Sequence, residues 1–201
     1  AQKCRTPFSI SEDDSGQQRL SAECCTSDLT LEEFLSLCGV MEKTNVEASS
    51  LEEYLNGTPS WRTDLYSQCG TLMSHDQSIE LFKNLGAQMV PELKATDDSV
   101  EAARSEQAKA LIEAYKNADV SLNQVYPQSF DLEDVRYWIK TYPEIANNVV
   151  WLDGRTEQFF TPELLSPSFE DLHKDGLRII APPLWALITS VDGEIRPSSY
   201  A

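Results

Sequence analysis

The sequence has 201 residues, enough for one domain of ordinary size with or without a small appendage. Hydrophobic residues make up 41% of the chain, so a folded core is expected and wholesale disorder is not. The 16 Lys and Arg residues against 33 Asp and Glu give a net charge of −17, which argues against binding nucleic acid or anionic lipid. No apolar run is long enough to predict a transmembrane helix.

Five cysteines are present, and three of them, Cys4, Cys24 and Cys25, fall within a segment of little hydrophobic periodicity. We expect residues 1–29 to be a loop-rich, disulfide-linked segment of a secreted protein. An odd number of cysteines leaves one thiol free or paired outside the sequence. The absence of a C-x-x-C pair and a total of two histidines argue against a zinc site. Neither a signal peptide nor an initiating Met opens the sequence, so we expect a processed or truncated N-terminus.

Regular secondary structure is predicted from residue 30 onward. Thr30 and Glu33 form a capping box that predicts a short helix before Gly39. Apolar periodicity and end signals then predict an alternation of helices and strands. The predicted helices are 74–85, 100–118, 132–142 and 169–174, and the predicted strands are 87–93, 124–130, 148–152 and 177–181. Strands that alternate with helices over short connections indicate a parallel sheet of the α/β class.

Functional residues of parallel sheets gather at the carboxyl ends of the strands. In this sequence those ends are 92–94, 128–130, 151–153 and 182–185, and they include Phe130 and Trp185. These four segments are therefore the places where we expect a site. Aromatic residues at strand ends are also typical of packing, so that alternative remains open.

The segment 92–94 has the most suggestive chemistry of the four. Glu92 and Lys94 are two residues apart, so on a strand they point to the same side. A carboxylate suits a cation and an ammonium suits an anion, which makes a metal ion together with a phosphate a plausible ligand. The alternative is an ordinary surface pair at the end of a strand.

Several short motifs occur in a fixed order along the chain. They are ECCTSDLTLEEF at 23–34, YLNGTPSWRTDLY at 54–66, GTL at 70–72, SIELF at 78–82, PELK at 91–94, PQSF at 127–130 and PSSYA at 197–201. No single motif is specific, but the ordered set resembles the glycerophosphodiester phosphodiesterase family, in particular its secreted, cysteine-bearing branch.

The resemblance implies a (β/α)8 TIM barrel that hydrolyses glycerophosphodiesters to glycerol 3-phosphate and an alcohol. It also implies a divalent ion, Ca²⁺ or Mg²⁺, held by acidic residues. Glu92 matches the metal-binding glutamate, and Lys94 matches the lysine that contacts the phosphate. Gln128 and Phe130 match the next strand end, which lines the substrate site, and Trp185 at the last predicted strand end is a further candidate contact.

The sequence also departs from the family pattern. It lacks the His-Arg-Gly motif, the Glu-x-Asp metal pair, the second catalytic histidine and the final tryptophan-bearing strand. His75 and His173 match neither catalytic histidine. We therefore expect a chain truncated at both ends, covering about strands four to seven of the barrel over residues 30–201, with 1–29 as part of a cysteine-bearing insertion. Such a chain should be inactive alone.

Two other functions remain possible. A secreted half-barrel could act as a non-catalytic binding or structural module. An inhibitor or nucleic-acid mimic would need its negative charge clustered on one face, whereas the carboxylates here are spread along the whole sequence.

Overall fold

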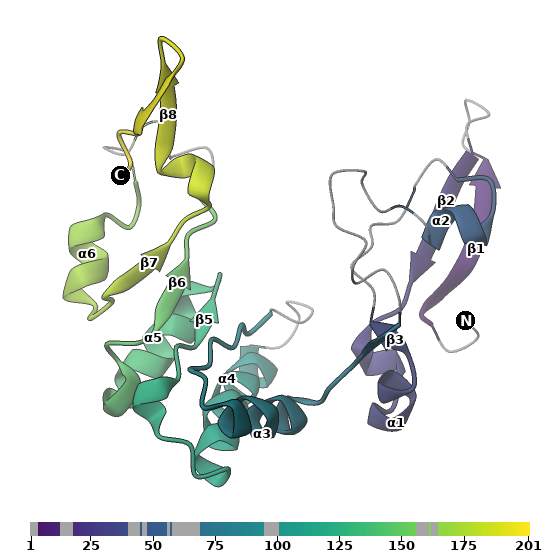
Figure 1. Cartoon of the computed structure of the whole chain (residues 1–201), viewed down its shortest axis with the longest axis horizontal. Coiled ribbons are helices and arrows are strands. Elements are labelled where there is room, and N and C mark those ends of the chain that lie inside the picture. The colour runs from purple at the N-terminus through teal and green to yellow at the C-terminus, as the bar shows by residue number, and fades with distance from the viewer. Residues whose placement is uncertain are drawn as a thin grey trace. The chain divides into compact units, whose positions relative to one another are not determined.

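A computed structural model describes residues 4–12, 18–39, 45, 48–55, 57, 69–94, 101–155, 161 and 165–201. The chain divides into two compact units, Ala1–Ser74 and His75–Ala201 (Figure 1). The boundary expected between residues 29 and 30 lies inside the first unit. Much of the matched motif at 54–66 lies outside the described residues.

The first unit begins with an antiparallel hairpin rather than with the loops that the sequence predicted. Strand β1 (Thr6–Glu12) pairs with β2 (Gln18–Glu23). Phe8 and Ile10 alternate with serines in β1, a strand period too short and too polar to stand out in the sequence. The Phe8 ring lies 5.4 Å from that of Tyr54 on helix α2 (Leu51–Leu55).

Disulfides cross-link this unit, as expected. Cys4 is bonded to Cys24 and Cys38 to Cys69, and Cys25 is free. The short helices η1 (Thr26–Asp28) and α1 (Leu31–Leu35) lie between Cys25 and Cys38 in the sequence. The expected capping box of α1 forms, since Thr30 Oγ1 accepts a hydrogen bond from the Glu33 amide and the Glu33 carboxylate accepts one from the Thr30 amide.

Helix α1 is shorter than the sequence predicted. A helix was expected up to Gly39, but Cys38 lies in β3 (Cys38–Gly39), which pairs with β4 (Gly70–Thr71) beside the Cys38–Cys69 disulfide. The cross-link and the strand pairing hold Cys38 in extended backbone, and the helix therefore ends before it.

The second unit contains the alternating helices and strands. Its elements are α3 (His75–Leu85), α4 (Glu101–Asn117), η2 (Leu122–Gln124), β5 (Gln128–Ser129), α5 (Leu132–Thr141), η3 (Pro143–Ile145), β6 (Val150–Leu152), α6 (Phe169–Lys174), β7 (Ile179–Ala181), η6 (Leu184–Ala186), β8 (Ile188–Val191) and β9 (Glu194–Pro197). All four helices predicted for this unit are present within one or two residues of their expected bounds.

Strands β5, β6 and β7 form a parallel sheet in that order, which confirms the predicted α/β class. The expected strand at 87–93 contributes two parallel bridges instead, Met89 to Val125 and Glu92 to Gln128. Pro91 lies between them and has no N–H to donate, so the ladder lacks a hydrogen bond at this position, although the Gln128 amide donates to the Pro91 carbonyl at 2.9 Å. Closure of the sheet into a barrel stays a prediction.

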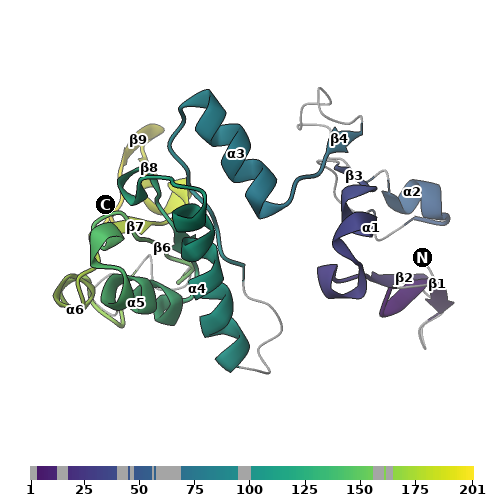
Figure 2. The ribbon, with the colours of Figure 1, turned by 90° about the horizontal axis from the view of Figure 1, so that it is seen from below.

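One face of the sheet is packed against helices α4, α5 and α6. The central cluster includes Ile112, Trp138, Trp151 and Leu172, with Leu93 and Ile180 against its edge. Helices α4 and α5 lie side by side (Figure 2), and the Trp138 indole donates a buried hydrogen bond of 2.8 Å to the carbonyl of Ala108.

The chain continues beyond the parallel sheet into an antiparallel hairpin that the sequence analysis did not predict. Strands β8 and β9 pair from Ile188–Pro197 to Val191–Glu194, and their residues are exposed throughout. Asp192 and Gly193 connect them with φ values of 54° and 81°. An Asp-Gly pair between two short β-prone runs is a strong hairpin signal.

None of the described helices combines the length and the apolar composition that crossing a membrane requires.

Candidate functional site

The segment that precedes β5 exposes Glu92 and Lys94 on the same side. Leu93 between them is partly buried and packs against the central core cluster, whereas its two neighbours are exposed. The backbone is held in this orientation because the Leu93 amide donates to the carbonyl of Gln128 at 2.9 Å. Glu92 and Lys94 therefore point away from the helices.

The strand register extends this helix-distant face across the sheet. Glu92 is bridged to Gln128, which pairs with Val150, which in turn pairs with Ile179. The row is polar at the first two positions and aliphatic at the other two. Phe130 follows Gln128 by two residues, toward the carboxyl end of β5.

A pocket of about 240 Å³ opens where these chain segments end. It is lined by Glu92, Leu93, Lys94, Ser129, Phe130 and Asp131. The Phe130 side chain is 62% exposed, which is unusual for a large apolar ring and leaves it accessible to a ligand. Within the described part of the chain, neither Glu92 nor Lys94 has a hydrogen-bond or ion-pair partner.

The residues predicted for the site are brought together only in part. Glu92, Lys94 and Phe130 line this pocket, and Gln128 is the bridge partner of Glu92. Trp185 lies on η6, 48% exposed, and is not among the described lining residues. The roles assigned to all five residues remain predictions.

The rim of the pocket is fixed to α5 through a buried serine. The Ser129 hydroxyl donates to the Asp134 carboxylate at 2.9 Å and accepts from the Asp131 amide at 3.0 Å. Asp131 itself caps α5, because its carboxylate accepts from the Glu133 amide at 2.8 Å. This arrangement fixes where β5 ends and α5 begins.

A second polar cluster lies at the carboxyl end of β6. The Asp153 side chain is fully buried and forms an ion pair of 2.6 Å with Arg155, which is 12% exposed. Tyr200 donates to the same carboxylate at 2.7 Å. Sequence analysis marked 151–153 as a strand end but did not find the partners, because Tyr200 lies 47 residues further along the chain.

The ionisation of this cluster follows from its surroundings. Burial acts to raise the pKa of Asp153, but the hydrogen bonds from Arg155 and Tyr200 outweigh it and the pKa is lowered. Burial and the hydrogen bond to Asp153 both raise the pKa of Tyr200. The pair is therefore a carboxylate with a neutral phenol at neutral pH.

The described residues do not form a complete metal site. No three of their His, Cys, Asp or Glu side chains lie close enough together to hold a metal ion. Ca²⁺ takes six to eight oxygen ligands and Mg²⁺ about six, so the Glu92 carboxylate could supply one or two of them. Asp131 lines the same pocket, but its carboxylate caps α5.

Neither histidine lines the strand-end pocket. His75 begins α3, where its ring meets that of Tyr115 edge-on at 5.1 Å. His173 lies in the last turn of α6. An acid–base role at the pocket is therefore not available to either residue as placed.

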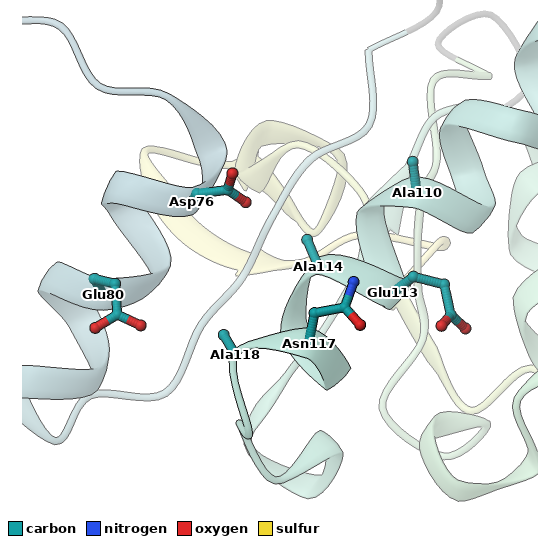
Figure 3. Close-up of a pocket in the computed structure, with 7 residues that line it drawn as sticks. All are labelled: Asp76, Glu80, Ala110, Glu113, Ala114, Asn117 and Ala118. Carbon is teal, nitrogen blue, oxygen red and sulfur yellow. The ribbon is translucent and has the colours of Figure 1, made fainter.

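A larger pocket, of about 580 Å³, lies between α3 and α4. Figure 3 shows Asp76 and Glu80 on α3, Ala110, Glu113, Ala114 and Asn117 on α4, and Ala118 directly after α4. The described lining contains three carboxylates and no cation. It has the wrong charge for a phosphate and lies on helices rather than at strand ends.

Comparisons with known proteins show similarity to a curated protein and to a solved structure. The chain is 33% identical over 170 residues to an extracellular protein of Arthroderma benhamiae, covering 80% of this chain and 68% of that protein. A crystal structure of a glycerophosphodiester phosphodiesterase from Parabacteroides distasonis aligns with a TM-score of 0.48 at 15% identity. That alignment covers 90% of this chain, which spans only 60% of the other, and it is too weak to argue from. No protein-family model matches the chain.

Proposed function

Because the chain belongs to the same family as the extracellular protein of Arthroderma benhamiae, we propose that it is secreted and that its strand-end pocket binds the phosphate of a glycerophosphodiester. The two disulfides support secretion, since such bonds persist in oxidising compartments. The reaction we propose is hydrolysis to glycerol 3-phosphate and an alcohol, in a barrel to which this chain contributes about strands four to seven.

The observation that supports this function best is the shared orientation of Glu92 and Lys94. Both line one pocket at the ends of parallel chain segments, and neither is paired with another described side chain. Lys94 would supply positive charge to a phosphate oxygen, and Glu92 would supply one ligand to Ca²⁺ or Mg²⁺. Such an ion, when bound, would neutralise charge on the phosphate.

The arrangement stabilises charge but does not transfer protons. Hydrolysis of a phosphodiester needs a proton acceptor and a proton donor. Since His75 and His173 lie away from the pocket, we expect the 201-residue chain to bind glycerol 3-phosphate without hydrolysing glycerophosphocholine. The same observation favours the second candidate function, a non-catalytic binding module.

Calorimetric titration of glycerol 3-phosphate into the chain tests the proposal. Lys94→Ala should weaken binding by about tenfold or more, because a hydrogen bond to a charged group contributes about 1.5 to 3 kcal/mol. Added Ca²⁺ or Mg²⁺ should strengthen binding to the unmodified chain more than to Glu92→Gln.

The matched controls are two exposed residues, Lys140 in the last turn of α5 and Glu144 in η3. Lys140→Ala and Glu144→Gln should leave the affinity unchanged. Equal affinity of Lys94→Ala and Lys140→Ala would refute phosphate binding at this pocket. Hydrolysis of glycerophosphocholine by the 201-residue chain would show instead that the acid–base groups lie within it.

A further inference from the structure

The buried cluster at the end of β6 contains several hydrogen bonds in addition to the Asp153–Arg155 ion pair. Arg155 donates to Asp153 from its backbone amide, from Nε and from Nη2, at 3.0, 2.9 and 2.6 Å. Its remaining amino group donates to the carbonyl of Pro167 at 2.6 Å. The guanidinium is therefore held at both ends and has one orientation.

That orientation places the guanidinium over an aromatic ring. Arg155 lies 4.6 Å from the ring centroid of Trp151, within the range of a cation–π interaction. The ring of Tyr200, whose hydroxyl donates to the Asp153 carboxylate, meets that of Phe169 edge-on at 5.2 Å. The cluster thus joins the end of β6, the start of α6 and the last residues of the chain.

Trp151 connects this cluster to the strand-end pocket. Its indole N–H donates to the carbonyl oxygen of Phe130 at 3.1 Å, and Phe130 lines the pocket. The Phe130 ring also lies beside Gly154, where an added Cβ would be 3.4 Å from Phe130 Cδ1. Trp151 and Gly154, both within two residues of Asp153, thus lie against the pocket residue Phe130.

We propose that Tyr200, Asp153 and Arg155 are positioning residues that hold Trp151, and through its indole N–H the backbone of Phe130, at the rim of the pocket. A buried ion pair is a weak contribution to stability, because desolvation offsets most of its attraction. Its hydrogen bonds do fix geometry, which a rim that must meet a ligand requires. The proposal deepens the phosphate-binding function and rests on it only for the effect on affinity.

Two substitutions test the network at different depths. Tyr200→Phe removes one hydroxyl from Asp153 and keeps the ion pair, so it should fold even if Arg155→Lys does not. Arg155→Lys keeps the charge but loses the planar fork. Two substitutions elsewhere are matched controls. Tyr142→Phe removes the hydroxyl that donates to the Glu113 carboxylate, and Arg136→Lys changes an arginine that donates to Glu133 and Asp175.

The direct measurement is the indole N–H signal of Trp151 in nuclear magnetic resonance spectra. The sequence has four tryptophans, and Trp151→Phe identifies the signal. We expect its chemical shift and its protection from hydrogen exchange to change in Tyr200→Phe and Arg155→Lys, and not in the controls. The dissociation constant for glycerol 3-phosphate should rise about threefold to tenfold in the same two variants, the size of one hydrogen bond.

The two proposals fail in different ways. An unchanged Trp151 signal in Tyr200→Phe would refute the positioning network, whatever the affinity. A changed signal in a chain that binds no glycerol 3-phosphate would support the network and refute the proposed function. A changed signal with unaltered affinity would also overturn the inference, because the network would then not act on the pocket.

Discussion

Asp153 is a residue whose ionisation depends on the fold. Its hydrogen bonds from Arg155 and Tyr200 lower its pKa in the folded chain below the ordinary value of 3.8. A carboxylate whose folded-state pKa is lowered stabilises the fold at every pH above that ordinary value. This contribution is lost as the pH falls through the lower, folded-state pKa.

Asp153→Asn should therefore destabilise the chain most at neutral pH. The change leaves the Arg155 charge without its carboxylate, at a cost on the order of 3 kcal/mol. Below pH 3.8 the difference from the unmodified chain should shrink. Urea unfolding at neutral and acidic pH measures both values, and a difference that did not vary with pH would contradict the ionised state of Asp153.

Among the elements, helices α4 and α5 are joined by a hydrogen bond from one indole. Trp138 is fully buried and bonds to the carbonyl of Ala108 on α4. Trp138→Phe removes this hydrogen bond and leaves a small cavity, so it should lower the free energy of unfolding by about 1 to 3 kcal/mol. Trp185→Phe, at a half-exposed position, is the control, and an equal loss in both variants would show that Trp138 does not join the helices.

Helices were more predictable than strands because their end signals are local. Asp131 caps α5, and Gly86 and Gly176 follow α3 and α6 with φ values of 66° and 97°. Strand bounds depend on partners that are distant in sequence. The apolar pattern at 87–93 predicts a full strand. In the structure this segment forms only two bridges with the 125–128 segment, on either side of Pro91.

The same distinction applies to the candidate site. The spacing of Glu92 and Lys94 was enough to predict a shared side, because it depends only on extended backbone. The contact of Tyr200 with Asp153 was not predictable, since nothing local specifies it. Trp185 was expected at the site because it follows the last predicted strand, yet it lies on η6 outside the described lining of the pocket.

For the whole molecule, the distribution of cysteines indicates that the two units are stabilised in different ways. All five lie in the first unit, where two disulfides close loops of 20 and 31 residues. Each such bond contributes about 3 kcal/mol by restricting the unfolded chain. The second unit depends on its core of aromatic and aliphatic side chains.

Reduction should therefore affect the two units differently. In dithiothreitol, amides of β1, β2 and α1 should lose protection from hydrogen exchange, whereas those of α4, α5 and β6 should keep it. Hydrogen exchange measured by mass spectrometry with peptide resolution distinguishes the two. Equal loss of protection in both units would mean that the second one needs the first to fold.

Trp151 belongs to the central core, and its indole N–H donates to the carbonyl of Phe130, which lines the pocket. A screen for thermal resistance and a screen for ligand capture would therefore select overlapping sets of substitutions around this indole. Attempts to engineer one property at neighbouring core positions will alter the other, and the two traits cannot be optimised separately there.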